Sequence, residues 1–147
     1  NSKSRLRMVA LYYIAGASRG IVVGTGNKVE DFGVGFYTKY GDGGVDISPI
    51  ADLTKTQVRK LAKTLGVNSQ IIKAPPTDGL WDDSRTDEEQ IGATYEELEW
   101  AMSFDGGTDL SQLTSRQQEV LEIYRSFHTR NKHKMLPIPV FELKEEF

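Results

Sequence analysis

The segment around which this chain is organised is residues 24–46, GTGNKVEDFGVGFYTKYGDGGVD. It directly follows a short β-branched run at residues 21–23, which predicts a strand. In open α/β sheets, ligands bind in the crevice outside the carboxyl ends of the strands. Gly24 and Gly26 flank Thr25, so the backbone can approach a ligand closely while the hydroxyl stays free to bond it. The segment predicts a ligand-binding loop, although glycine clusters more often mark plain turns.

Length, charge and cysteine content narrow the class of protein. The 147 residues are near the common size of one domain, so residues 1–147 are expected to form a single domain or part of one. The net charge of -3 gives no support to a general nucleic-acid binder, and the absence of cysteine rules out disulfides and thiolate metal sites. No run approaches the ~20 apolar residues that span a bilayer. A cytoplasmic protein without nucleic-acid or membrane partners is expected.

Four helices are predicted from apolar periodicity and capping signals. Apolar residues recur at three- and four-residue spacing from Leu6 to Ile14, which predicts a helix that ends near residues 16–20. Three capping boxes, in which Thr precedes Gln or Glu by three residues, predict the other starts. They are Thr54 with Gln57, Thr94 with Glu97, and Thr114 with Gln117. Lys55 is therefore expected in a first helical turn, beside free backbone N–H groups that suit an anion.

Two short strands are predicted, at residues 21–23 and at Ile71 and Ile72. The order of elements is α/β in type, with helices flanking a parallel sheet. Two strands are fewer than such a sheet usually has, so further strands are expected to be missing from the chain or supplied by a partner. Two other segments are expected to be irregular: an acidic loop at residues 78–90 and a turn at 105–109. The C-terminal region is a basic tail that carries Arg130, Lys132, His133 and Lys134, and it cannot be helical past Pro137 and Pro139.

Five motifs, in order and spacing, resemble the ammonia-dependent NAD synthetases. They are GTGNKVED, GFYTKYGDGGVDISPIADLTKTQ, KAPPT, TDEEQIGATYEELE and NKHKMLP, and the resemblance covers residues 3–139. It implies a Rossmann-like parallel α/β fold of the adenine-nucleotide α-hydrolase type, within the N-type ATP-pyrophosphatase group. It also implies a ligase that adenylates the nicotinate carboxylate of deamido-NAD with ATP, releases pyrophosphate, and lets ammonia displace AMP to form NAD. The TKYGDGG motif favours the ammonia-using branch over its glutamine-dependent relatives.

The resemblance also implies roles for single residues. A carboxylate must approach a polyanion in this reaction, so cations and a metal ion are needed to offset repulsion. Lys55 and Lys39 match catalytic positions; Thr25, Lys55 and Thr77 match positions that bind the co-substrate ATP, and Glu30 matches a Mg²⁺ ligand. Arg5, Tyr12, Phe36, Lys39, Asp46, His133 and Lys134 match positions that hold deamido-NAD across a homodimer interface.

One difference in length affects this assignment. The chain has one residue more between Glu30 and Lys39 than some members of the family, so the alignment of residues 31–34 stays open. Asp31 is therefore a second candidate for part of the metal role, because hard cations prefer carboxylate oxygens.

The pyrophosphate loop of the family, Ser-Gly-Gly-x-Asp-Ser after the first strand, is absent from the sequence. Residues 43–48 lack the leading Ser and run into Pro49, and residues 105–109 lie between two predicted helices. Neither can replace that loop. The sequence is therefore interpreted as the C-terminal portion of a NAD synthetase domain, with N-terminal strands missing. These residues alone are expected to bind nucleotide weakly and not to catalyse.

Other interpretations stay open at this point. Without the resemblance, Glu30, Lys39 and Lys55 are ordinary solvated surface charges, and His133 is an ordinary surface histidine. One alternative function is that of another ATP-pyrophosphatase, which adenylates a different acceptor. A second is that of a non-catalytic nucleotide-binding or dimerisation module.

Overall fold

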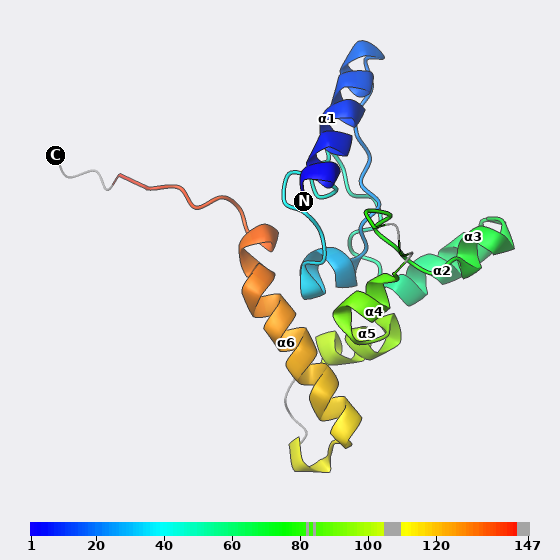
Figure 1. Cartoon of the computed structure of the whole chain (residues 1–147), viewed down its shortest axis with the longest axis vertical. Helices are drawn as coiled ribbons and strands as arrows, with labels where there is room; N and C mark the ends of the chain where they lie inside the picture. The colour runs from blue at the N-terminus through cyan, green and yellow to red at the C-terminus, as the bar shows by residue number, and fades with distance from the viewer. Residues whose placement is uncertain (82, 84, 105–109, 144–147) are drawn as a thin grey trace.

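The helices radiate from a centre that residues 24–46 and α5 occupy (Figure 1). The computed structural model describes residues 1–81, 83, 85–104 and 110–143, so the predicted turn at 105–109 lies outside the described residues. Within these ranges the elements are α1 (Ser2–Ala17), the π-helix η1 (Val29–Val34), α2 (Lys55–Thr64), α3 (Ser69–Lys73), α4 (Asp87–Ile91), α5 (Tyr95–Ser103), the 3-10 helix η2 (Leu110–Gln112) and α6 (Ser115–Met135).

The hydrophobic core lies where α5 and α6 pack on the π-helix. Val29 and Val34 of the π-helix and Tyr95 and Leu98 of α5 are each 0% exposed, and Val120 of α6 is 1% exposed. Burying an aliphatic or aromatic side chain of this size contributes about 1.5–3 kcal/mol. The best-packed part of the described chain therefore holds the π-helix in place, inside the segment that the sequence singles out.

The capping signals are confirmed. Thr54, Thr94 and Thr114 each cap a helix with the complete reciprocal pair of hydrogen bonds. The first predicted helix is also present and ends at Ala17, as expected. Its apolar face is not covered by the described residues, however, since Leu6 is 69% exposed and Tyr13 is 78% exposed.

Two sequence predictions of local structure are wrong. Ile71 and Ile72 lie in α3, because the side chain of Asn68 caps this helix and no neighbouring strand is there among the described residues to pair with them. The expected loop at residues 78–90 contains the start of α4, which has its own capping box of Thr86 with Glu89. The expectation that the chain is not helical past the prolines is confirmed: α6 ends at Met135, and Arg130, Lys132, His133 and Lys134 lie in its last turns.

A single parallel bridge joins Val23 and Ile47 within the described residues. Gly24 N donates to Ile47 O at 2.7 Å, and Asp46 N donates to Val22 O at 2.9 Å. Residues 21–23 are thus extended and pair in parallel, but the described ranges contain no complete sheet. A strand becomes stable only beside further strands, which residues 71–72 do not supply.

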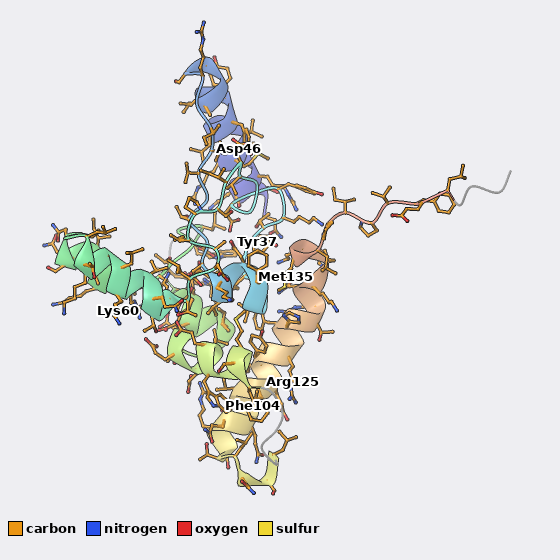
Figure 2. The ribbon with its side chains drawn as sticks, turned by 180° about the vertical axis from the view of Figure 1, so that it is seen from behind. Tyr37, Asp46, Lys60, Phe104, Arg125 and Met135 are labelled. Carbon is orange, nitrogen blue, oxygen red and sulfur yellow. The ribbon has the colours of Figure 1, made fainter. Side chains whose placement is uncertain are left out.

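Side chains of α6 hold the carboxyl end of the π-helix. His128 Nδ1 lies 2.8 Å from Gly33 O, and Asn131 Nδ2 donates to Val34 O at 2.8 Å. Lys134 Nζ donates to the carbonyls of Gly35 and Tyr37, each at 2.8 Å. Figure 2 shows Tyr37 beside Met135, where this part of the loop meets the end of α6. These three side chains, the α6 brace, bond carbonyls that lack helical partners.

No helix among the described residues has both the length and the apolar character needed to cross a membrane.

Candidate functional site

The carboxylate of Glu30 is the centre of a hydrogen-bonded cluster. Its Oε1 accepts from Lys55 Nζ at 3.1 Å and from the Tyr95 hydroxyl at 2.6 Å, and its Oε2 accepts from Asn27 N at 3.1 Å. The side chains of Glu30 and Lys55 are 15% and 21% exposed, so this ion pair still reaches solvent. Together with Asp87, these side chains form the Glu30 site.

Local structure explains why these groups meet. Asn27 is 1% exposed, and its Oδ1 accepts from the backbone N of Val29 and of Glu30 at 3.0 and 3.1 Å, which starts the π-helix and directs Glu30. The Thr54 capping box places Lys55 at the first position of α2, and the Thr94 capping box places Tyr95 at the first position of α5. Three helix starts therefore converge on one carboxylate.

Tyr95 and Asp87 form the buried side of the site. The Tyr95 ring lies under Lys55 Nζ, with 4.8 Å from the nitrogen to the ring centroid, and its hydroxyl is 3.3 Å from Asp87 Oδ2. Burial, and then the charge of Glu30, raise the pKa of Tyr95 and that of Asp87. Asp87 Oδ1 is buried without a hydrogen-bond partner among the described residues. The site is thus rich in negative charge beneath the ammonium group of Lys55.

Asp31 lies beside this site and faces Gly26. A Cβ atom on Gly26 would collide with the Asp31 carboxylate, and one on Gly24 would lie 2.9 Å from Val45 Cγ2. Both glycines therefore make room for the protein's own side chains, whereas the sequence suggested room for a ligand. Burial, and then the charges of Glu30 and Asp42, raise the pKa of Asp31 to about 6.

Asp31→Asn is expected to raise the free energy of unfolding by about 1 kcal/mol at pH 8 and to leave it unchanged near pH 3.5. Because folding raises the pKa of Asp31 from 3.8 to about 6, stability falls as the pH rises through this interval, and the whole penalty is present above it. The shift corresponds to about 3 kcal/mol, which we reduce to about 1 kcal/mol for solvent screening. Urea titrations at both pH values measure the change.

The matched control is Asp52→Asn. The hydrogen bond from Lys28 lowers the pKa of exposed Asp52, so the charged Asp52 carboxylate stabilises the folded state at neutral pH. Asp52→Asn should therefore lower the free energy of unfolding, whereas Asp31→Asn raises it. A loss of stability in Asp31→Asn at pH 8 would contradict the burial of an unpaired charge.

The amino end of α2 is already occupied by an acidic side chain. Thr56 N donates to Glu99 Oε1 of α5 at 2.8 Å, and Gln57 N donates to Thr54 Oγ1 at 3.3 Å. A carboxylate at a helix N-terminus is favourable because the helix dipole is positive there. The anion-binding arrangement predicted around Lys55 is therefore present, with Glu99 as the anion at the backbone groups and Glu30 at the ammonium.

A second group of predicted residues meets where α1, the loop and α6 come together. Lys39 Nζ donates to His133 O at 2.8 Å, and Arg5 Nε donates to Lys39 O at 3.3 Å. His133 is exposed, and its Nδ1 lies 3.2 Å from Arg130 O. Burial lowers the pKa of Lys134, which uses two hydrogen bonds in the α6 brace. Arg5, Lys39, His133 and Lys134 together form the basic group.

Tyr12 and Asp46 form a third contact. The Tyr12 hydroxyl donates to Asp46 Oδ1 at 3.1 Å, while Asp46 Oδ2 accepts from Val22 N at 2.7 Å. Burial and this hydrogen bond raise the pKa of Tyr12. Figure 2 shows Asp46 against α1. Asp46 therefore ties α1 to the paired segment at residues 22–24.

The remaining predicted residues are not part of these contacts. Phe36 packs on the core and tilts against Phe127, with ring centroids 6.4 Å apart. Thr25 and Thr77 are exposed, and in the described ranges no hydrogen bond joins either to the Glu30 site. Thr77 Oγ1 accepts from Gly79 N at 3.2 Å.

Sequence reasoning missed Asn27, Asp87, Tyr95 and Glu99. Tyr95 directly follows the capping residue Thr94, so its helical position could be predicted, but its contact with Glu30, 65 residues away, is tertiary. Within the described chain, no group of three or more His, Cys, Asp or Glu side chains is arranged as a metal site. Any divalent cation here would need ligand oxygens from a substrate or from water.

The chain is similar to proteins of known family. A family model described as NAD synthase matches residues 1–137. An NH(3)-dependent NAD(+) synthetase of Methanococcoides burtonii is 52% identical over 99 residues, which are 67% of this chain and 37% of that protein. One of Thermoplasma volcanium is 43% identical over 136 residues, which are 91% of this chain and 53% of that protein.

Solved structures agree with this comparison. The NMN synthetase of Francisella tularensis has a TM-score of 0.80 and 36% identity, over 97% of this chain and 55% of that one. The NH3-dependent NAD synthetase of Campylobacter jejuni, in complex with nitrate, has a TM-score of 0.66 and 24% identity over 95% and 53%, which shows a shared fold. The chain spans about half the length of the curated relatives it matches. From the family model and these identities, the chain belongs to the NAD synthase family.

Proposed function

We propose that this chain is one portion of a NAD synthetase domain, in an enzyme that forms NAD from deamido-NAD, ATP and ammonia. The reaction passes through an adenylated nicotinate carboxylate and releases pyrophosphate and AMP. The observation that carries the proposal is the partly exposed pair of Glu30 and Lys55, inside a chain that matches the NAD synthase family from residue 1 to 137. The carboxylate can bind a metal cation, and the ammonium group beside it can bind the phosphates of ATP.

In this proposal Lys55 binds the phosphates of ATP and stabilises the negative charge that develops as pyrophosphate leaves. Its position at the first turn of α2 supports this role, because a lysine on a helix start can reach a bound anion. Thr25 and Thr77, which are exposed, contribute hydroxyl groups to ATP. Charge stabilisation by one such donor is typically worth about 2–4 kcal/mol in the transition state.

The basic group is the proposed binding site for deamido-NAD. Arg5, Lys39, His133 and Lys134 come from three segments and gather positive charge, which complements the diphosphate of a dinucleotide. Lys39 is the proposed catalytic member, because its ammonium is held only by the His133 carbonyl and by the ring of exposed Tyr40, 5.6 Å from the centroid, within the described chain and can turn to substrate. Asp46 and Tyr12 would bind polar groups of the same substrate, and Phe36 would line its site.

The residues at the Glu30 site fit a magnesium ion. Mg²⁺ is usually bound by one or two carboxylates together with substrate phosphates and water, and does not need an all-protein cage. Glu30 has oxygen lone pairs to spare, and the neighbouring Asp31 carboxylate has no hydrogen bond in the described part of the chain. Glu30 would hold the ion, with Asp31 as the second ligand. The ion would neutralise phosphate charge, as metal ions do in phosphoryl chemistry.

We further propose that the enzyme is a cytoplasmic homodimer with a parallel sheet. The exposed apolar face of α1, with Leu6 at 69% and Val9 at 57%, supports self-association, since large apolar patches usually mark interfaces. The parallel bridge between Val23 and Ile47 supports the sheet. A monomeric mass in sedimentation experiments would contradict the dimer.

The test uses a protein that contains these 147 residues and is as long as the curated relatives. This protein is called the full-length protein below. Incubation with deamido-NAD, ATP, Mg²⁺ and ammonium should yield NAD, AMP and pyrophosphate in equal amounts, measured by chromatography. The rival acceptor is the mononucleotide precursor that lacks the amide, which the similarity to an NMN synthetase favours. If the enzyme forms NMN in preference to NAD, its substrate is this mononucleotide precursor and not deamido-NAD. Binding of nucleotide with no product would favour the non-catalytic module.

The 147-residue chain alone is expected to bind ATP weakly and to form no NAD, because its sequence lacks the Ser-Gly-Gly-x-Asp-Ser loop of the family. The same assay on a sample of verified mass checks this. Turnover by that chain alone would refute the expectation.

A further inference from the structure

We propose that Tyr95 is a positioning residue, whose hydroxyl fixes the carboxylate of Glu30 and whose ring fixes the ammonium of Lys55. The inference rests on the proposed function, since it assigns Tyr95 a role in the reaction that Glu30 and Lys55 serve.

The hydroxyl determines which way the carboxylate faces. At 2.6 Å the Tyr95 hydroxyl is the closest hydrogen-bond partner of Glu30 in the described chain, shorter than the contacts from Lys55 and Asn27 at 3.1 Å each. A short O–H···O⁻ bond is about twice as strong as one between neutral groups. The two oxygens of Glu30 are thereby held by donors on opposite sides, Asn27 at Oε2 and Tyr95 with Lys55 at Oε1.

The ring determines where the lysine can lie. Lys55 has a flexible four-carbon stem, and its Nζ stands 4.8 Å from the centroid of the Tyr95 ring. A cation over the face of an aromatic ring is attracted by the negative charge of that face. Glu30 and the ring therefore hold the ammonium from two directions, and Tyr95 acts on both members of the pair.

Tyr95 itself is fixed by the core. It is 0% exposed, and its backbone N donates to Glu88 Oε1 at 2.9 Å. Leu98, one turn further along α5, is also 0% exposed against the same core. On its far side the hydroxyl lies 3.3 Å from Asp87 Oδ2. A rigid side chain that contacts two partly exposed charged groups can hold them at a set separation, which is how a supporting residue pre-organises a site.

The experiment is a double-mutant cycle in the full-length protein. Tyr95→Phe keeps the ring and removes only the hydroxyl. We expect kcat to fall at least tenfold while the melting temperature shifts by no more than it does in the matched control, Tyr124→Phe. Tyr124 is a half-buried tyrosine that packs on the same core and has no contact with Glu30 in the described residues. In a Glu30→Gln background the same Tyr95→Phe change should lower kcat less than twofold, because the carboxylate that it orients is gone.

Each outcome decides the proposal. A Tyr95→Phe protein with the kcat of the parent overturns it, and so does an equal loss of kcat in the parent and in the Glu30→Gln background, which would indicate a general structural effect. If the parent protein forms no NAD, the proposed function fails, and the inference is then judged by calorimetric titration with ATP and Mg²⁺. In that titration Tyr95→Phe should weaken binding at least fivefold relative to Tyr124→Phe, and equal affinities overturn the positioning role.

Discussion

Replacing Lys55 by Met in the full-length protein is expected to lower kcat/KM for NAD formation by about 30-fold to 1000-fold. This range corresponds to about 2–4 kcal/mol of lost transition-state stabilisation for one charge-stabilising donor. Met keeps most of the length of the stem, and the Thr54 capping box that starts α2 does not involve the side chain of residue 55. Glu30 also keeps its bonds from Tyr95 and Asn27, so the loss of stability should be about 1–2 kcal/mol.

The matched control is Lys28→Met. Lys28 also forms an ion pair, at 2.9 Å with Asp52, but Asp52 is 95% exposed and such surface pairs contribute about 0–1 kcal/mol. Initial rates over a range of ATP concentrations separate kcat from KM. Similar rates for the two variants would show that Lys55 is an ordinary surface charge, as one interpretation of the sequence holds.

Gly35→Ala is expected to destabilise the protein by about 2–5 kcal/mol. Gly35 ends the π-helix with φ at 62°, a left-handed conformation that costs a residue with a Cβ about 1–2 kcal/mol. The added Cβ would also lie 2.6 Å from Asn131 Cβ and 2.9 Å from Met135 Cε. Overpacking of this kind typically costs about 1–3 kcal/mol. Since Asn131 is part of the α6 brace, its displacement also breaks the bond to Val34 O.

Gly66→Ala separates these two costs. Gly66 follows α2 with φ at 71°, but a Cβ there would meet no atom of the described residues within 4 Å. It should therefore show only the conformational penalty, about 1–2 kcal/mol. Urea titrations of both variants give the difference, which is the cost of the contact with α6. Equal losses of stability in the two variants would mean that displacing Asn131 and Met135 costs no measurable free energy.

The helices could be predicted from the sequence because capping is local. Thr54, Thr94 and Thr114 each bond a backbone group three residues away, so the signal needs no tertiary information. Thr86 carries the same signal before α4, and only the acidic composition around it suggested a loop. The strand predicted at Ile71 and Ile72 was wrong, because β-branched residues form a strand only when a neighbour pairs with them, and these two lie in α3.

Only part of the candidate site could be predicted from the sequence. Glu30 and Lys55 could be selected by resemblance to a family, but their ion pair joins residues 25 positions apart and depends on the fold. The residues around Tyr95 are typical of those around any core aromatic residue, and nothing in the sequence indicates that its hydroxyl contacts Glu30. Phe36 was assigned to a ligand by resemblance, and its packing against Phe127 could likewise not be read from the local sequence.

The π-helix at Val29–Val34 affects how the chain beside Glu30 can accommodate a change in length. A π-helical turn has one residue more than an α-helical turn, and such turns are often found at functional sites. Residues 29–34 thus contain a wider turn than an α-helix would, just after Asn27, which holds Glu30. Loss of one residue there, for example exposed Phe32, would leave an ordinary helical turn between fixed ends. Because Asn27 holds Glu30 from the amino-terminal side, such a deletion is expected to leave Glu30 in its place.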